Sequence, residues 1–212
     1  MFQNLKREIN ERFDTTEEHF RLSPKKPANI AQTVKGLMFI EIYAIWEFTL
    51  RETVLRSNET IASHRHKLSE LRPSLLALFL DAQINSLRDC SEKKNWVERL
   101  RFFNLCLSDD LITTVDVIPH DGSHYRHTQV EMIFRVLGIS KAFVMRKRHL
   151  YMIDEIVNNR NSVAHGQETP LEIGRQFTRE DMVKRLKLMR SICLRIVSIV
   201  QEYCGLPNRH KR

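Results

Sequence analysis

The stretch LMFIEIYAIWEFTL, residues Leu37–Leu50, decides the fold class of this chain of 212 residues. Its apolar side chains occur on all sides of an ideal helix, which is typical of a helix that other helices enclose. Glu41 and Glu47 interrupt the stretch, and its 14 residues are too few to cross a membrane. We therefore expect it to form the centre of a helical core, within a helix from Asn29 to Ser57.

Helical patterns continue on both sides of this central helix. The chain contains only six glycines and six prolines, and residues of high helix propensity make up much of the remainder. We therefore predict an all-α protein. The other predicted helices cover residues 5–22, 61–88 or 68–88 with a bend at Pro73, 93–107, 129–137, 140–164 and 179–203.

Local signals set several of these boundaries. Pro24 and Pro27 end the first helix, because proline cannot continue one, and Thr178 with Asp181 has the spacing of a capping box for the last. The run Thr113–Ile118 favours extended structure. We expect a single helical domain over residues 1–212, with its core at about 29–204, an N-terminal helix at 5–22, an irregular insert at about 108–128 and a frayed basic tail at 208–212.

Charge and motif content narrow the classes of function. The formal charge of +8 and pI of about 9.5 favour an anionic partner, and nucleic acid ranks ahead of membrane because no stretch pairs a one-sided basic face with a bulky apolar one. The chain has no P-loop, GxGxxG, GxSxG or Cys-His zinc signature, so we expect neither a cofactor nor a metal. The first residues lack an apolar leader and the four cysteines lack CxxC spacing, which predicts a cytoplasmic protein with reduced thiols.

The run NNRNSVAHG, residues Asn158–Gly166, carries the candidate chemistry. The apolar stripe of its helix, continued by helical steps, reaches Arg160 or Asn161 where a leucine would be expected. A buried guanidinium is costly unless it is paired. Arg160 is therefore either neutralised inside the chain or held for an anion at a contact between subunits.

This run resembles a known family motif. Arg160-Asn161-x3-His165-Gly166, at the end of a long helix, resembles the Arg-x4-6-His signature of the HEPN superfamily (higher eukaryotes and prokaryotes nucleotide-binding). The segment Lys35–Glu47 resembles a second block found in the MAE-like bacterial branch of that superfamily. The resemblance implies an antiparallel helical bundle that forms a homodimer, with the two motifs in one cleft.

The resemblance also implies roles for residues. Many HEPN proteins are metal-independent endoribonucleases, often toxins or anti-phage effectors, whereas others only bind RNA or partner proteins. By position, Arg160 would bind phosphate, Asn161 would be the adjacent polar residue, His165 the catalytic histidine, and Glu47 the acidic residue of the central helix. Glu168 stands where members silenced by a nucleotidyltransferase carry a tyrosine, so that form of control is not expected.

The residue types suit RNA cleavage on chemical grounds. Histidine titrates near pH 6.5 and can transfer the protons of the 2′-hydroxyl and the leaving group, while a guanidinium can stabilise the negative phosphorane. A structural alternative is that Arg160 pairs with a core carboxylate and His165 only caps the helix. Glu47 has two candidate partners, Arg51 one turn later and Arg160 across the bundle. Gly166 is expected to end the helix in a left-handed cap.

A histidine-rich run at residues 120–127 allows three interpretations. Its three imidazoles could hold a metal, the run could be an exposed loop, or it could contact RNA through stacking by Tyr125 and phosphate binding by Arg126. The exposed loop is the default, because a turn-rich segment rarely fixes metal geometry.

These observations lead to one functional hypothesis and two rivals. We expect a metal-independent endoribonuclease of HEPN type, a homodimer that acts in a toxin–antitoxin or phage-defence system with an antitoxin or another defence protein as partner. The first rival is a non-catalytic HEPN-like module that binds RNA or a partner, as a regulatory or antitoxin-like subunit. The second is a DNA-binding helical regulator, which would leave Arg160 unexplained.

Overall fold

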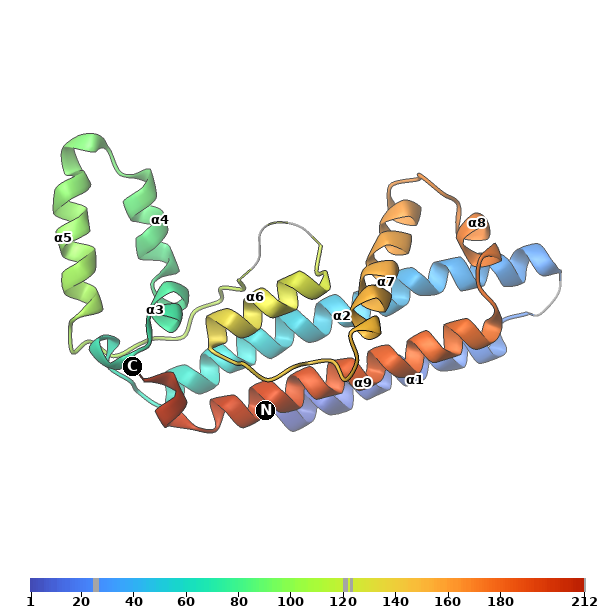
Figure 1. Ribbon diagram of the computed structural model, residues 1–212, viewed down its shortest axis with the longest axis horizontal. Helices are drawn as coiled ribbons and strands as arrows, with labels where there is room; N and C mark the ends of the chain where they lie inside the picture. Colours follow the sequence, from blue (N-terminus) through green and yellow to red (C-terminus); the bar gives the residue numbers. More distant parts are fainter. Residues whose placement is uncertain (25–26, 120–121, 123, 212) are drawn as a thin grey trace.

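A computed structural model describes residues 1–24, 27–119, 122 and 124–211. Figure 1 shows an elongated molecule in which three long helices run along the longest axis and shorter elements lie along one side. The described residues form helices and irregular segments, with two isolated β-bridges and no strand. The all-α prediction is therefore confirmed.

The three long helices are α1 (Phe2–Leu22), α2 (Ala28–Ser63) and α9 (Arg179–Cys204). The charged composition of α1 conceals an apolar stripe, whose buried residues are Phe2, Leu5, Ile9, Phe13, Thr16 and Phe20. This stripe packs against α2 and α9. The predicted capping box of α9 is present, with the Thr178 hydroxyl accepting from the Asp181 backbone and the Asp181 carboxylate accepting in return.

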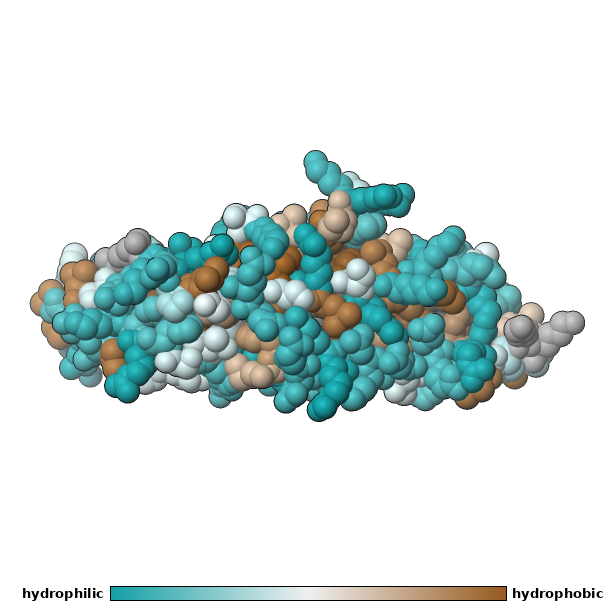
Figure 2. All heavy atoms as spheres, turned by 90° about the horizontal axis from the view of Figure 1, so that it is seen from below, coloured by the Kyte–Doolittle hydropathy of each residue, from teal (hydrophilic) through white to brown (hydrophobic). Residues whose placement is uncertain are grey.

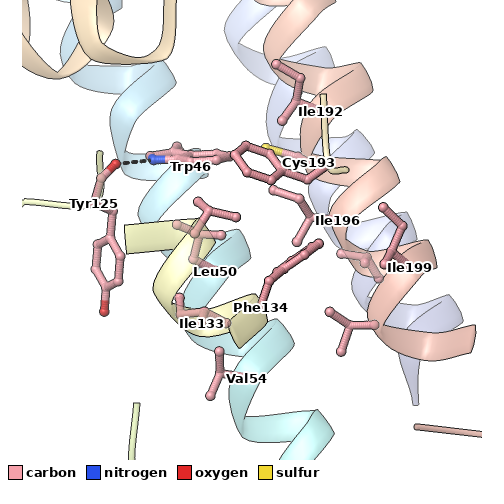
Figure 3. Close-up of a cluster of buried hydrophobic side chains, with 14 of the residues drawn as sticks. Trp46, Leu50, Val54, Tyr125, Ile133, Phe134, Ile192, Cys193, Ile196 and Ile199 are labelled. Carbon is pink, nitrogen blue, oxygen red and sulfur yellow. Dashed lines mark hydrogen bonds between the residues drawn. The ribbon is translucent and has the colours of Figure 1, made fainter. Parts of the chain in front are cut away.

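The core lies where α2, α9 and α6 (His127–Leu137) meet. Figure 3 shows Trp46, Leu50 and Val54 of α2 facing side chains of the other two helices, which include Ile133, Phe134, Ile192, Cys193 and Ile196. The indole N–H of Trp46 donates a hydrogen bond of 2.6 Å to the Tyr125 carbonyl. A fully buried tryptophan thus keeps its polar group satisfied and fixes the loop before α6.

A short helix that the sequence pattern did not predict, α8 (Pro170–Arg175), lies directly on α2. It begins with a second capping box, formed by Thr169 and Glu172. The two backbones approach so closely that a Cβ on Gly36 would lie 2.0 Å from the Pro170 carbonyl oxygen. A Cβ on Gly174 would lie 1.8 Å from the carbonyl oxygen of Gln32. Only glycine fits at this crossing.

The helix predicted at 61–88 or 68–88 is wrong as a single element, although residues 73–79 and 81–89 are helical. In its place are η1 (Leu68–Glu70), α3 (Pro73–Phe79) and α4 (Asp81–Asp89). The backbone groups of His66 and Leu68 bond to Ile112 and Asp110 instead of to a helical turn, and Pro73 begins a helix instead of bending one. These long-range backbone bonds override the local helical pattern.

The helix predicted at 140–164 is shorter than expected, because α7 spans only Arg148–Ala164. The preceding α6 ends at Gly138, which has a φ of 77°, and residues 139–147 are irregular. Phe143 is buried there, with its ring centroid 5.6 Å from that of Phe134. It fills the core from an irregular segment, so the local apolar spacing gave a false helical signal.

A hairpin of α4 and α5 (Asn95–Cys106), joined through η2 (Glu92–Lys94), projects at one end of the molecule (Figure 1). The described residues between α5 and α6 contain no helix or strand, which confirms the irregular character predicted for this part. The Asn58 amide group donates to the Val115 and Val117 carbonyls and ties the segment to α2. The chain ends with η3 (Pro207–His210), so the prediction of a frayed tail is wrong for residues 208–211.

Candidate functional site

The candidate motif lies at the C-terminal end of α7. Ile153, Ile156 and Val157 are buried and fix the helix against the core. The helix ends as predicted, with Gly166 at a φ of 68°. Hydrogen bonds run from the Gly166 N–H to the Val163 carbonyl and from the Gln167 N–H to the Ser162 carbonyl, which is the Schellman pattern. The motif is therefore held by backbone bonds.

Arg160 is half-buried and has no carboxylate partner among the described residues. Its guanidinium carbon lies 4.5 Å from the centroid of the Tyr43 ring, and its Nη1 donates a 3.0 Å hydrogen bond to Asn161 Oδ1. Both partners are neutral. The positive charge therefore rests on an aromatic face and an amide, which argues against the alternative in which a core carboxylate neutralises it.

A pocket of about 330 Å³ opens beside this guanidinium. Residues from α2, from the loop before α6 and from α7 line it: Tyr43, Glu47, Arg51, Gly122, His124, Tyr125 and Arg160. The structure thus brings Glu47 and Arg160 together across the bundle. Glu47 is exposed and forms no ion pair with Arg51 or Arg160, so neither of the two pairings considered for it is present.

His165 is exposed and lies beside a second histidine that the motif does not contain. The ring centroids of His165 and His124 are 6.2 Å apart, and the His124 ring meets the Tyr43 ring edge-on at 6.4 Å. Burial lowers the pKa of His124, and the positive charge of Arg160 lowers it further. The imidazole of His124 is therefore biased towards its neutral form, which can accept a proton.

Several contacts hold the loop that carries His124. Besides the bond from Trp46, the Tyr125 N–H donates to the Tyr43 hydroxyl at 3.3 Å. Arg126 donates to Asn158 Oδ1 at 2.7 Å, and His127 Nδ1 lies 2.7 Å from Asp154 Oδ2. The loop is thereby attached to α2 on one side and to α7 on the other, which places His124 between them.

These contacts also change the interpretation of residues 120–127. Tyr125 is 9% exposed, so the idea that it stacks on an RNA base is wrong. His120 lies outside the described residues, and the described part of the chain contains no group of three or more His, Cys, Asp or Glu side chains suited to a metal ion. Sequence reasoning named His124 only as a possible metal ligand and missed its place beside His165, because spacing along the chain gives no signal of that proximity.

Comparison with known proteins adds the family. The model of the RiboL-PSP-HEPN family matches residues 2–202. The chain belongs to this family. The resemblance to the HEPN superfamily seen in the sequence is confirmed, although the matching model is named for the RiboL-PSP branch and not for the MAE-like one.

The match extends over this HEPN domain from α1 to α9, and so includes the N-terminal helix. No curated protein and no solved structure matches the chain. Among the described residues, no helix combines the length and the apolar character that crossing a membrane requires.

Proposed function

We propose that this HEPN domain is a metal-independent endoribonuclease whose site contains Arg160, His165 and His124. One observation carries the proposal. The guanidinium of Arg160, which has no carboxylate partner among the described residues, borders a pocket that His124 also lines with its lowered pKa, and the exposed imidazole of His165 lies beside His124. This site provides a cation for phosphate and two groups for proton transfer.

Each residue has a defined part in this scheme. Neutral His124 accepts the proton of the attacking 2′-hydroxyl, and His165 donates a proton to the 5′-oxygen that leaves. Arg160 binds the phosphate and stabilises the negative charge of the phosphorane. Asn161 positions the guanidinium through the 3.0 Å hydrogen bond. Glu47 also lines the pocket, where its negative charge offsets part of the positive charge of Arg51 and Arg160.

The proposal includes a homodimer and a biological role. Two-fold pairing would set two such pockets in one cleft, so that one RNA strand contacts both copies. The net charge of +8 favours RNA as the anionic partner. An endoribonuclease endangers its own cell, which supports a toxin or phage-defence role with an antitoxin or activating protein as a further partner.

RNA cleavage in the presence of EDTA tests the enzyme directly. We expect the wild type to cleave, and His165→Ala, Arg160→Ala and His124→Ala each to lose activity by about 10²-fold or more. His19→Ala is the matched control, because its side chain is 65% exposed on α1 and lies outside the pocket. Full cleavage by the His165→Ala, Arg160→Ala and His124→Ala variants would reject the site.

The second candidate is a non-catalytic HEPN module that binds RNA or a partner protein. It is favoured by the two arginines of the pocket, Arg51 and Arg160, which can bind phosphate without any proton transfer. Under this alternative, RNA stays intact with every variant, while Arg160→Ala weakens binding and His165→Ala does not. The same set of proteins therefore separates the two functions.

A further inference from the structure

The outer face of α5 is the most apolar exposed surface on any single helix of the described chain. Its large side chains are mostly solvent-exposed: Trp96 77%, Val97 64%, Leu100 65%, Phe103 63% and Leu107 65%. Surfaces of this kind mark contact sites with other molecules. In Figure 2, brown hydrophobic residues reach the surface at the end of the molecule where α5 lies.

The outer face of α5 is exposed because α4 packs against the opposite side of this helix. The opposite side of α5, with Glu98, Arg101, Phe102 and Leu105, faces α4. Cys106 is the single buried residue of α5, and α4 has none. The hairpin thus contributes little to the core, and the exposed face points away from the body.

The spacing of the exposed residues is that of a helix-pairing seam. Trp96, Leu100, Phe103 and Leu107, which we call the α5 stripe, follow steps of four, three and four residues. At about 100° per residue they fall within roughly 60° of one another. This is the alternation of the d and a positions in a coiled coil. A seam of this kind fits another helix with the same spacing.

The charged residues that flank α5 indicate that the partner helix is a second copy of α5. The residues before α5, Lys93 and Lys94, are basic and exposed, whereas those after it, Asp109 and Asp110, are acidic and exposed. If a second copy of α5 runs antiparallel with Leu100 opposite Phe103, Trp96 lies opposite Leu107. The same register brings Lys93 opposite Asp110, whereas Asp109 already forms an ion pair of 2.7 Å with Lys67 of its own chain. One two-fold arrangement therefore matches the apolar residues with each other and Lys93 with Asp110.

We propose that the α5 stripe binds the α5 stripe of a second copy of this chain, antiparallel and about a two-fold axis. The contact is separate from the proposed RNA cleft, because no residue of the pocket lies in the hairpin. One helix pair buries less than the roughly 800 Å² per partner of a standard interface. Association through this contact alone is therefore weak and depends on concentration.

Sedimentation velocity over a concentration series tests the contact with the full chain. The average mass of the wild type rises with concentration, from monomer to dimer, or from dimer to tetramer if a cleft dimer is present. Leu100→Glu and Phe103→Glu each weaken the association through α5 and raise its dissociation constant at least about tenfold. The control is Leu22→Glu, which is 67% exposed on α1 at the other end of the molecule and leaves the association unchanged.

Charge reversal tests the register. Lys93→Glu or Asp110→Lys alone places like charges opposite each other in two symmetric pairs and weakens association by roughly tenfold. The double variant restores it. The proposal is overturned if the wild type keeps one mass at all concentrations, if the stripe variants associate like the wild type, or if the double variant is as weak as the single ones. None of these results depends on RNA cleavage.

Discussion

At the scale of the residue, His210 is buried in a cluster of aromatic rings near the end of the chain. Its ring centroid lies 5.2 Å from those of His66 and Tyr203, and its Nδ1 lies 3.1 Å from His66 Nε2. Burial lowers the pKa of His210 to about 4, and the nearby His66, His64 and Arg72 act in the same direction. The folded protein therefore keeps this imidazole neutral.

This burial predicts a stability that depends on pH. An unfolded histidine binds its proton near pH 6.5, so between pH 6.5 and about 4 the unfolded state holds more protons than the folded one. The free energy of unfolding therefore falls as pH drops through this window, by up to about 3 kcal/mol at 1.36 kcal/mol per unit. Urea unfolding at pH 4.5 and 7 measures the loss, and His210→Gln should reduce it. If the free energy of unfolding falls equally with pH in His210→Gln and in the wild type, buried His210 is not the cause of the loss.

At the scale of the element, the crossing of α8 over α2 depends on the absence of two side chains. Gly174→Ala would place a Cβ 1.8 Å from the backbone oxygen of Gln32, which no side-chain rotation can relieve. We expect a destabilisation of about 1–3 kcal/mol in urea unfolding. Gly205→Ala is the matched control, because its nearest neighbour would be 3.4 Å away. Equal stability of the two variants would show that α8 can shift without cost.

At the scale of the whole molecule, α1 and the α4–α5 hairpin differ in how they contribute to the core. Leu5, Ile9 and Phe13 of α1 are fully buried, whereas the hairpin helices bury only Cys106. We expect removal of residues 1–24 to abolish a cooperative thermal transition, since it exposes the facing sides of α2 and α9. Replacement of residues 81–107 by a short Gly-Ser linker is a deletion of similar length. It should leave the midpoint temperature of thermal unfolding within a few degrees of the wild-type value. Calorimetry measures both, and the opposite order of stabilities would refute this division.

The sequence alone determined those features that depend on neighbours along the chain. The central helix around Trp46, the capping box at Thr178 and the left-handed end at Gly166 were predicted correctly, because periodicity, capping and positive φ are local properties. The expectation that other helices enclose the central helix is wrong, since Leu37, Ala44 and Glu47 are exposed on it. The Arg160–His165 motif was placed at the end of its helix for the same reason. Its role in catalysis stays a prediction.

Tertiary structure alone decided which distant groups meet. His124 lies beside His165, and Tyr43 lies beneath Arg160, because the loop before α6 is attached to both α2 and α7. Phe143 was predicted to lie in a helix but packs against Phe134 in the core from an irregular segment. Burial and long-range hydrogen bonds stabilise such arrangements by amounts that exceed helix propensities of at most about 1 kcal/mol per residue outside proline, so no local pattern can encode them.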